Sequence, residues 1–162
     1  MNWLSKNLDS RRVFIQTLEE LDDPKNIIVT SDVGMNYLTD TKLKVFNFGV
    51  TEQSSVIISA SLALSGYIVW FYSMINFVVF RPYEMVRNAI CMHNANVKLL
   101  GVKGSEAYKF LGFSHNLLHD REDKKVLSNL PNLKIHIPKS LQGVRETVIQ
   151  ESRRNGPCYI RL

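Results

Sequence analysis

The sequence predicts one α/β domain, built as a parallel β-sheet with helices on both faces. Short runs of apolar, β-branched residues alternate along the chain with longer segments whose apolar residues recur at the period of a helix. The chain has 162 residues, of which 45% are apolar. That length suits one domain with a sizeable core and is too short for two full-sized domains.

Six runs are predicted as strands, because each is short, largely apolar and bounded by turn residues. They are residues 27–30, 44–48, 67–72, 97–102, 133–137 and 158–162. Four longer segments are predicted as helices, namely residues 11–21, 51–64, 79–92 and 141–153. Thr51 is expected to cap the second helix, and Pro82 is expected in the first turn of the third.

Composition and charge argue against several classes of function. The net charge is +5 with no stripe of basic residues between aromatics, which disfavours nucleic-acid binding. The mixed-sign run 121–125 is interpreted as solvated surface. Polar residues interrupt the most apolar stretch, residues 54–80, so no membrane span is predicted. Two cysteines make no disulfide framework and the first residues hold no apolar signal, so a cytoplasmic location is expected.

Glu52 is a first candidate for chemistry, because it follows the predicted strand 44–48 at the start of a helix. The carboxyl ends of parallel strands are where α/β proteins bind ligands. On the surface, Glu52 would compensate the helix dipole, which is worth about 0.3–1 kcal/mol. If buried, it would hydrogen-bond a heteroaromatic ring, and burial would raise its pKa and keep a proton available.

His115 is a second candidate, because it follows a glycine turn in the segment 112–116. It is either a proton shuttle or substrate ligand, or a loop histidine without a role. His119 lies four residues on, which is a helical spacing for metal ligands. No third ligand accompanies the pair, so a metal site is not predicted.

The aromatic segment 71–84 is a third candidate, either as the wall of a pocket for a flat ring or as ordinary core. The chain contains no glycine-rich phosphate loop.

In this order, these segments resemble the pyrimidine-binding domain of transketolase-like thiamine diphosphate enzymes, a family that includes deoxyxylulose-phosphate synthase. Residues 48–53 resemble the stretch around the family's catalytic glutamate, and residues 71–73 and 81–87 resemble the strand and helix that follow. Residues 112–116 with Asp120 resemble its Gly-Pro-Thr-His-Gln segment, and residues 155–161 resemble its closing strand. The resemblance covers nearly the whole chain and implies the three-layer thiamine diphosphate-binding fold.

The resemblance implies roles for residues at a cofactor site. Glu52 takes the place of the glutamate that hydrogen-bonds N1′ of the cofactor's aminopyrimidine and favours its imino tautomer. Ile75 falls where the family usually stacks a phenylalanine on that ring, and Phe77 is the alternative at this position. Tyr72 is also assigned to the cofactor site.

The resemblance also implies contacts with a sugar or keto-acid substrate, from which a two-carbon ketol unit passes to an aldehyde. His115 takes the role of a substrate-facing histidine. Arg11 sits where transketolases often carry a phosphate-binding arginine. Lys103 falls near a family histidine that meets substrate, and it could anchor a phosphate as a point charge.

The chain lacks the Gly-Asp-Gly…Asn motif with which the family holds diphosphate and Mg²⁺. We therefore expect residues 1–162 to be a pyrimidine-binding domain alone, with the diphosphate-binding and third domains absent. The chain would be a subunit of a split enzyme or a piece of a longer protein. A diphosphate-binding partner subunit would hold the Mg²⁺, and a paired copy would cover apolar surface around residues 56–64.

Two other functions stay open at this point. Ile75, Leu111 and Phe113 replace a phenylalanine, an acidic residue and a proline of the family pattern, which favours a non-catalytic scaffold or regulatory subunit that keeps the fold. The third possibility is an unrelated α/β module that binds a nucleotide.

Overall fold

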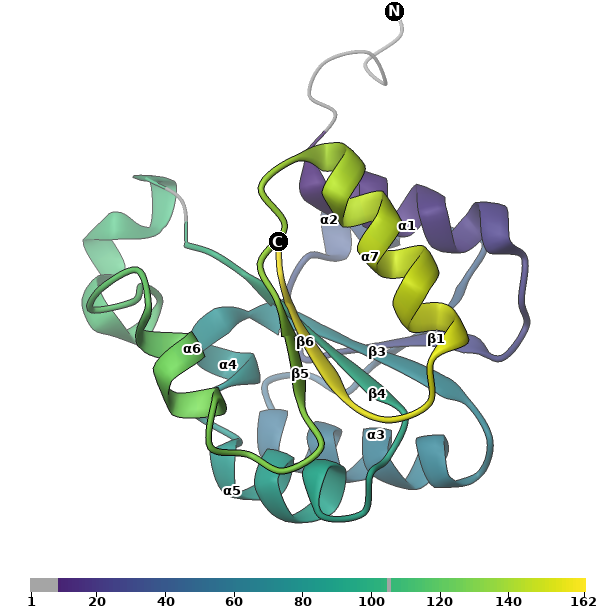
Figure 1. Ribbon diagram of the computed structural model, residues 1–162. Helices are drawn as coiled ribbons and strands as arrows, with labels where there is room; N and C mark the ends of the chain where they lie inside the picture. Colours follow the sequence, from purple (N-terminus) through teal and green to yellow (C-terminus); the bar gives the residue numbers. More distant parts are fainter. Residues whose placement is uncertain (1–8, 105) are drawn as a thin grey trace, which may run out of the picture.

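A computed structural model describes residues 9–104 and 106–162, and it confirms the predicted α/β class (Figure 1). Its six strands are all parallel and lie in the order β2-β1-β3-β4-β6-β5. The strands are β1 (Asn26–Thr30), β2 (Lys44–Asn47), β3 (Ile68–Met74), β4 (Val97–Val102), β5 (Lys134–His136) and β6 (Cys158–Arg161). Each predicted strand is confirmed to within two residues at either end.

Helices cover both faces of the sheet, as Figure 1 shows. On one face, α1 (Ser10–Leu21) and α7 (Leu141–Arg153) contact each other. On the other, α3 (Glu52–Leu64) packs against η2 (Val86–Cys91), which is a π-helix. Consecutive residues of β3 serve the two cores in turn, since alternate strand side chains point to opposite faces. Trp70 belongs to the first core and Phe71 to the second, and both side chains are fully buried.

The predicted helix over residues 79–92 is wrong as a single element. The chain forms α4 (Ile75–Val78), turns, and then forms α5 (Tyr83–Met85), which continues into η2. Pro82 precedes α5 and has no N–H to extend a helical ladder, so the chain breaks there. The hydrogen bond from the N–H of Met92 to the carbonyl of Arg87 spans five residues, which marks the wider π-turn.

Three short helices were not predicted: α2 (Met35–Leu38), η3 (Glu106–Ser114) and α6 (Glu122–Leu127). The interpretation of residues 121–125 as solvated surface is wrong at Asp123, which is fully buried within α6. Tyr159 and Arg161 of β6 donate hydrogen bonds to its carboxylate. A charged run can therefore contain one buried member when another element supplies its partners.

Thr51 precedes α3 as predicted, but its side chain does not cap the helix. Its hydroxyl donates instead to the carbonyl of Phe48, at 2.9 Å. In the described part of the chain, no helix is long and apolar enough to cross a bilayer.

The order of the strands predicts a ligand-binding site at the carboxyl ends of β1 and β3. The chain leaves β1 for the edge strand β2 and returns to β3 on the other side of β1, so the strand order reverses there. Open parallel sheets bind ligands outside the carboxyl ends of strands at such a reversal. The loops after β1, β2, β3 and β4 all reach this edge.

Candidate functional site

Two adjoining cavities lie at the carboxyl edge of the sheet. The first, which we call the Glu52 cavity, has a volume of about 450 Å³. The second, the Arg11 cavity, has a volume of about 120 Å³. Four residues line both of them: Val33, Gly34, Met74 and Tyr108. The larger volume is within the usual range for small-molecule sites.

Glu52 lies on the wall of the larger cavity, at the first residue of α3. Its side chain is 3% exposed, so the dipole-compensating surface glutamate considered from the sequence is not what the structure shows. Arg81 donates a hydrogen bond from Nη1 to Glu52 Oε1 at 2.7 Å. The same guanidinium lies over the ring of Phe77, 4.0 Å from its centroid.

His115 lines the same cavity from the end of η3. Its ring meets the edge of Phe77 with centroids 5.0 Å apart, and Tyr108 lies parallel to it at 6.4 Å. Ser114 Oγ is 2.7 Å from His115 Nδ1, so one ring nitrogen already has a local partner. The Asn76 amide fixes this segment to α4 by donating to the carbonyls of Phe113 and Asn116.

The Arg11 cavity is lined by two cations and three phenols. They are Arg11, Lys103, Tyr37, Tyr72 and Tyr108. The Arg11 guanidinium bonds Asp9 Oδ2 at 2.6 Å and stacks on Tyr37 at 4.4 Å. Burial opposes ionisation of Asp9, but the hydrogen bonds from Arg11, the Arg12 N–H and Tyr37 outweigh it and hold the pKa of Asp9 below its ordinary value. Burial raises the pKa of the Tyr72 hydroxyl far above its ordinary value.

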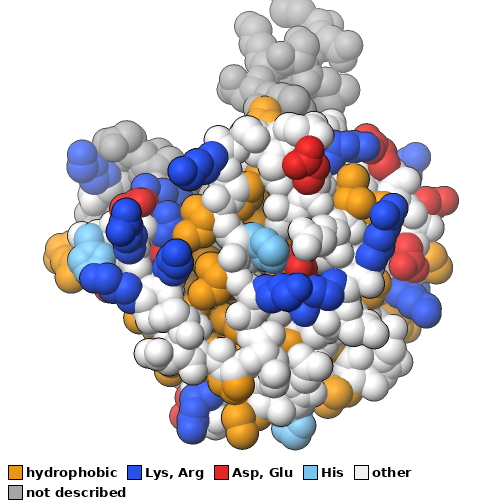
Figure 2. Space-filling model, in the orientation of Figure 1, with side chains coloured by type: hydrophobic (Ala, Val, Ile, Leu, Met, Phe, Trp, Pro, Cys, Tyr) orange, Lys and Arg blue, Asp and Glu red, His pale blue; other side chains and the backbone are white. Residues whose placement is uncertain are grey.

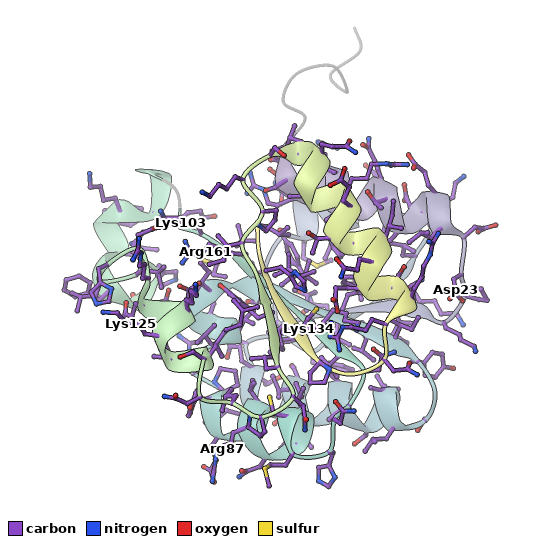
Figure 3. All side chains as sticks on the ribbon, in the orientation of Figure 1. Asp23, Arg87, Lys103, Lys125, Lys134 and Arg161 are labelled. Carbon is purple, nitrogen blue, oxygen red and sulfur yellow. The ribbon has the colours of Figure 1, made fainter. Side chains whose placement is uncertain are left out.

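Lys103 connects this cavity to the end of β6. Its Nζ donates to Asp120 Oδ1 at 2.9 Å, and the Arg161 guanidinium bonds the same oxygen at 3.1 Å. Figure 3 shows Lys103 and Arg161 at the same end of the sheet. In Figure 2, several Lys and Arg side chains surround apolar ones over η3 and α6. The Lys103 side chain is 54% exposed, so it adds a solvent-accessible cation to the Arg11 cavity.

The structure brings together six of the seven residues assigned from the sequence. Glu52, Phe77 and His115 line one cavity, and Arg11, Tyr72 and Lys103 line the other. Ile75 does not join them: its side chain is 1% exposed and packs in the core beneath α3. It is the first residue of α4 and packs into the same core as Val78, three residues on.

Among the lining residues that sequence reasoning missed, Arg81 and Tyr108 contact the predicted site residues directly. Arg81 lies 29 positions from Glu52, and the break at Pro82 brings it back over Phe77. The signal available was its position before Pro82, a residue that interrupts helices. Among the described residues, no three His, Cys, Asp or Glu side chains are grouped so as to hold a metal ion.

Comparison with known protein families shows which family this chain belongs to. The family profile described as "Transketolase, pyrimidine binding domain" matches residues 10–162. The chain belongs to this family. Its members, transketolases and deoxyxylulose-phosphate synthases, depend on thiamine diphosphate.

Relatives of this transketolase-type domain include subunits of split enzymes. The chain is 33% identical over 159 residues to an apulose-4-phosphate transketolase subunit of Phocaeicola vulgatus, covering 94% of this chain and 50% of the relative. It is 33% identical over 119 residues to the protein of the same name from Actinobacillus succinogenes, covering 74% of this chain and 37% of that one. The chain thus spans half or less of these relatives.

A solved structure has the same fold. It is titled "Split gene transketolase, inactive beta4 tetramer" and superimposes with a TM-score of 0.82 at 26% identity. The match covers 96% of this chain and 51% of that one.

Proposed function

We propose that this chain supplies the pyrimidine-binding half of a thiamine diphosphate-dependent transketolase-like enzyme, which passes a two-carbon ketol unit from a ketose or keto acid to an aldehyde. The observation that carries the proposal is that the buried Glu52 carboxylate and the Phe77 ring line one cavity of suitable size and contact the same guanidinium. The guanidinium now between them is flat and rich in N–H groups, so the site fits an aminopyrimidine in shape and in donor chemistry.

Glu52 would hold the aminopyrimidine through a hydrogen bond to a ring nitrogen. Because the Glu52 carboxyl group is 3% exposed, it would exchange a proton with a bound ring rather than with bulk water, which would favour one tautomer of the ring. When bound, thiamine diphosphate would supply the electron sink for cleavage of the donor's carbon–carbon bond. Phe77 would provide the flat apolar face against which the ring is oriented.

His115 would face the substrate from across the Glu52 cavity, held there by its edge contact with Phe77 and by Ser114. Arg11 and Lys103 would attract the anionic end of a substrate in the adjoining cavity. Both cations already pair with an aspartate, so a phosphate or carboxylate would have to compete with Asp9 and Asp120. The Arg11 cavity would therefore favour multiply charged groups.

The chain would act together with a diphosphate-binding subunit that holds the diphosphate and Mg²⁺. It would also pair with a second copy through the outer face of α3. Val56, Ala60 and Ala63 of this helix are buried against the sheet, while Ile57 and Leu64 are 47% and 63% exposed. An outer face with two such side chains favours a protein contact.

Reconstitution tests the proposal. The chain is mixed with a separate subunit that carries a Gly-Asp-Gly…Asn diphosphate motif, with thiamine diphosphate and with Mg²⁺, and ketol transfer to an aldehyde acceptor is followed. We expect transfer that requires all four components. A stable complex without cofactor-dependent transfer would support the scaffold role instead, and binding of a nucleotide in preference to thiamine diphosphate would support the third possibility.

A further inference from the structure

We propose that in the free subunit the Arg81 side chain fills the position where the aminopyrimidine would bind, and that the cofactor must displace it. This inference rests on the proposed function. It assigns to Arg81 a positioning role: the residue keeps the Glu52 carboxylate and the Phe77 ring paired until the cofactor arrives.

Arg81 makes both contacts that the proposed ligand needs. Its Nη1 lies 2.7 Å from Glu52 Oε1, where a ring nitrogen would bind. Its planar guanidinium lies 4.0 Å from the centroid of Phe77, where an aromatic ring would stack. One side chain thus satisfies a buried acceptor and covers an aromatic face, and a flat heteroaromatic ring cannot make the same two contacts while it stays.

This position of the Arg81 side chain is favourable because the two groups that it contacts are buried. Glu52 and Phe77 are 3% and 7% exposed, and a buried carboxylate without a partner is costly. The free subunit therefore gains from an internal counter-ion. Arg81 supplies it through the hydrogen bond from its Nη1 to Glu52 Oε1.

Arg81 can also leave. Its side chain is 42% exposed, so it has a path into solvent that does not disturb the core. Its backbone stays anchored, because its N–H bonds the Asn76 carbonyl and its own carbonyl accepts from Gln53. Rotation of the Arg81 side chain would free the binding position, with the loss of one charge-assisted hydrogen bond and one cation–π contact.

Binding of free thiamine to the isolated full chain tests this role, with calorimetry and NMR on wild type, Arg81→Ala and Arg87→Ala. Arg87 is the matched control: it is an exposed arginine on η2 that points away from the fold in Figure 3 and bonds Asn88. Arg81→Ala should bind thiamine about tenfold more tightly than wild type, because no internal contact has to break. Arg87→Ala should bind as wild type does.

A second readout follows the side chain itself. The Nε–H signal of Arg81 in wild type should move when thiamine binds, whereas that of Arg87 should not. If thiamine binds wild type and Arg81→Ala equally, or binds Arg81→Ala more weakly, the proposed displacement of Arg81 by the cofactor is overturned while the proposed function stands. If thiamine binds no variant at millimolar concentration, the proposed displacement of Arg81 by the cofactor is overturned, whereas the proposed function is decided separately by reconstitution with the diphosphate-binding subunit.

Discussion

Gly34 shows at the scale of one residue how tightly the two cavities are built. It lines both, has a φ of +74°, and lies against the ring of Tyr72. A Cβ at this position would fall well inside contact distance of that ring. Because Tyr72 is 1% exposed, its ring has no room to move away.

Gly34→Ala is therefore expected to lower the free energy of unfolding by about 2–4 kcal/mol, from overpacking and from the left-handed backbone together. Gly49→Ala is the matched control, since Gly49 has a φ of +69° but nothing within 4 Å of its added Cβ. The control should lose about 1 kcal/mol, from the backbone alone. Urea unfolding of both variants measures the difference, and equal losses would show that Tyr72 does not restrict this position.

The position of Glu52 at the start of α3 could be predicted from the sequence, whereas the side chains that surround it in the cavity could not. Glu52 follows a strand and begins a helix, and a parallel sheet brings such positions to one edge. Whether Ile75 or Phe77 faces the cavity depends on where β3 ends. The strand ends at Met74 and the helix α4 follows at once, so Ile75 and Val78, three residues apart, pack into the core while Phe77 lines the cavity.

At the scale of elements, Asp123 ties α6 to the end of β6. Its buried carboxylate accepts hydrogen bonds from Tyr159 at 2.6 Å and from Arg161 Nε at 3.0 Å. Burial alone would raise the pKa of Asp123, but these hydrogen bonds outweigh it and hold the pKa below the ordinary 3.8. The folded state therefore favours the ionised form.

The sign of this shift predicts how stability depends on pH. The contribution of Asp123 is fully present above its unfolded pKa and is lost as the pH falls through that value toward the lower folded pKa. Asp123→Asn should cost about 3 kcal/mol at pH 7 and should flatten the loss of stability below about pH 4. Urea unfolding across this range measures it, with the exposed Asp40→Asn as control. An unchanged acid slope in Asp123→Asn would contradict the assignment.

The long elements were predictable because hydrophobic period and turn residues agree along them, as in α7 and β4. The short ones were not. The η3 segment and α6 have no sustained period, and tertiary partners decide which of their side chains are buried. His115 directly follows η3, and α6 carries Asp123, a partner of Arg161.

At the scale of the whole molecule, the outer face of α3 predicts an assembly. Ile57→Asp should convert a paired state into a monomer without loss of helix content, because Ile57 is 47% exposed and contributes little to the core. Light scattering coupled to size exclusion measures the mass, and circular dichroism measures the fold. Leu141→Asp, at an exposed leucine of α7 on the opposite face, should leave the mass unchanged. Equal masses for wild type and Ile57→Asp would show that α3 is not part of the interface.

The most direct test of the account is the turnover of Glu52→Gln in the reconstituted two-subunit enzyme. Glutamine keeps the shape and a hydrogen bond but cannot exchange a proton with a bound ring. Turnover should fall by about 10²–10⁴-fold, with the unfolding midpoint and subunit assembly close to those of wild type. Turnover at the wild-type rate in a folded, assembled Glu52→Gln enzyme would contradict the account.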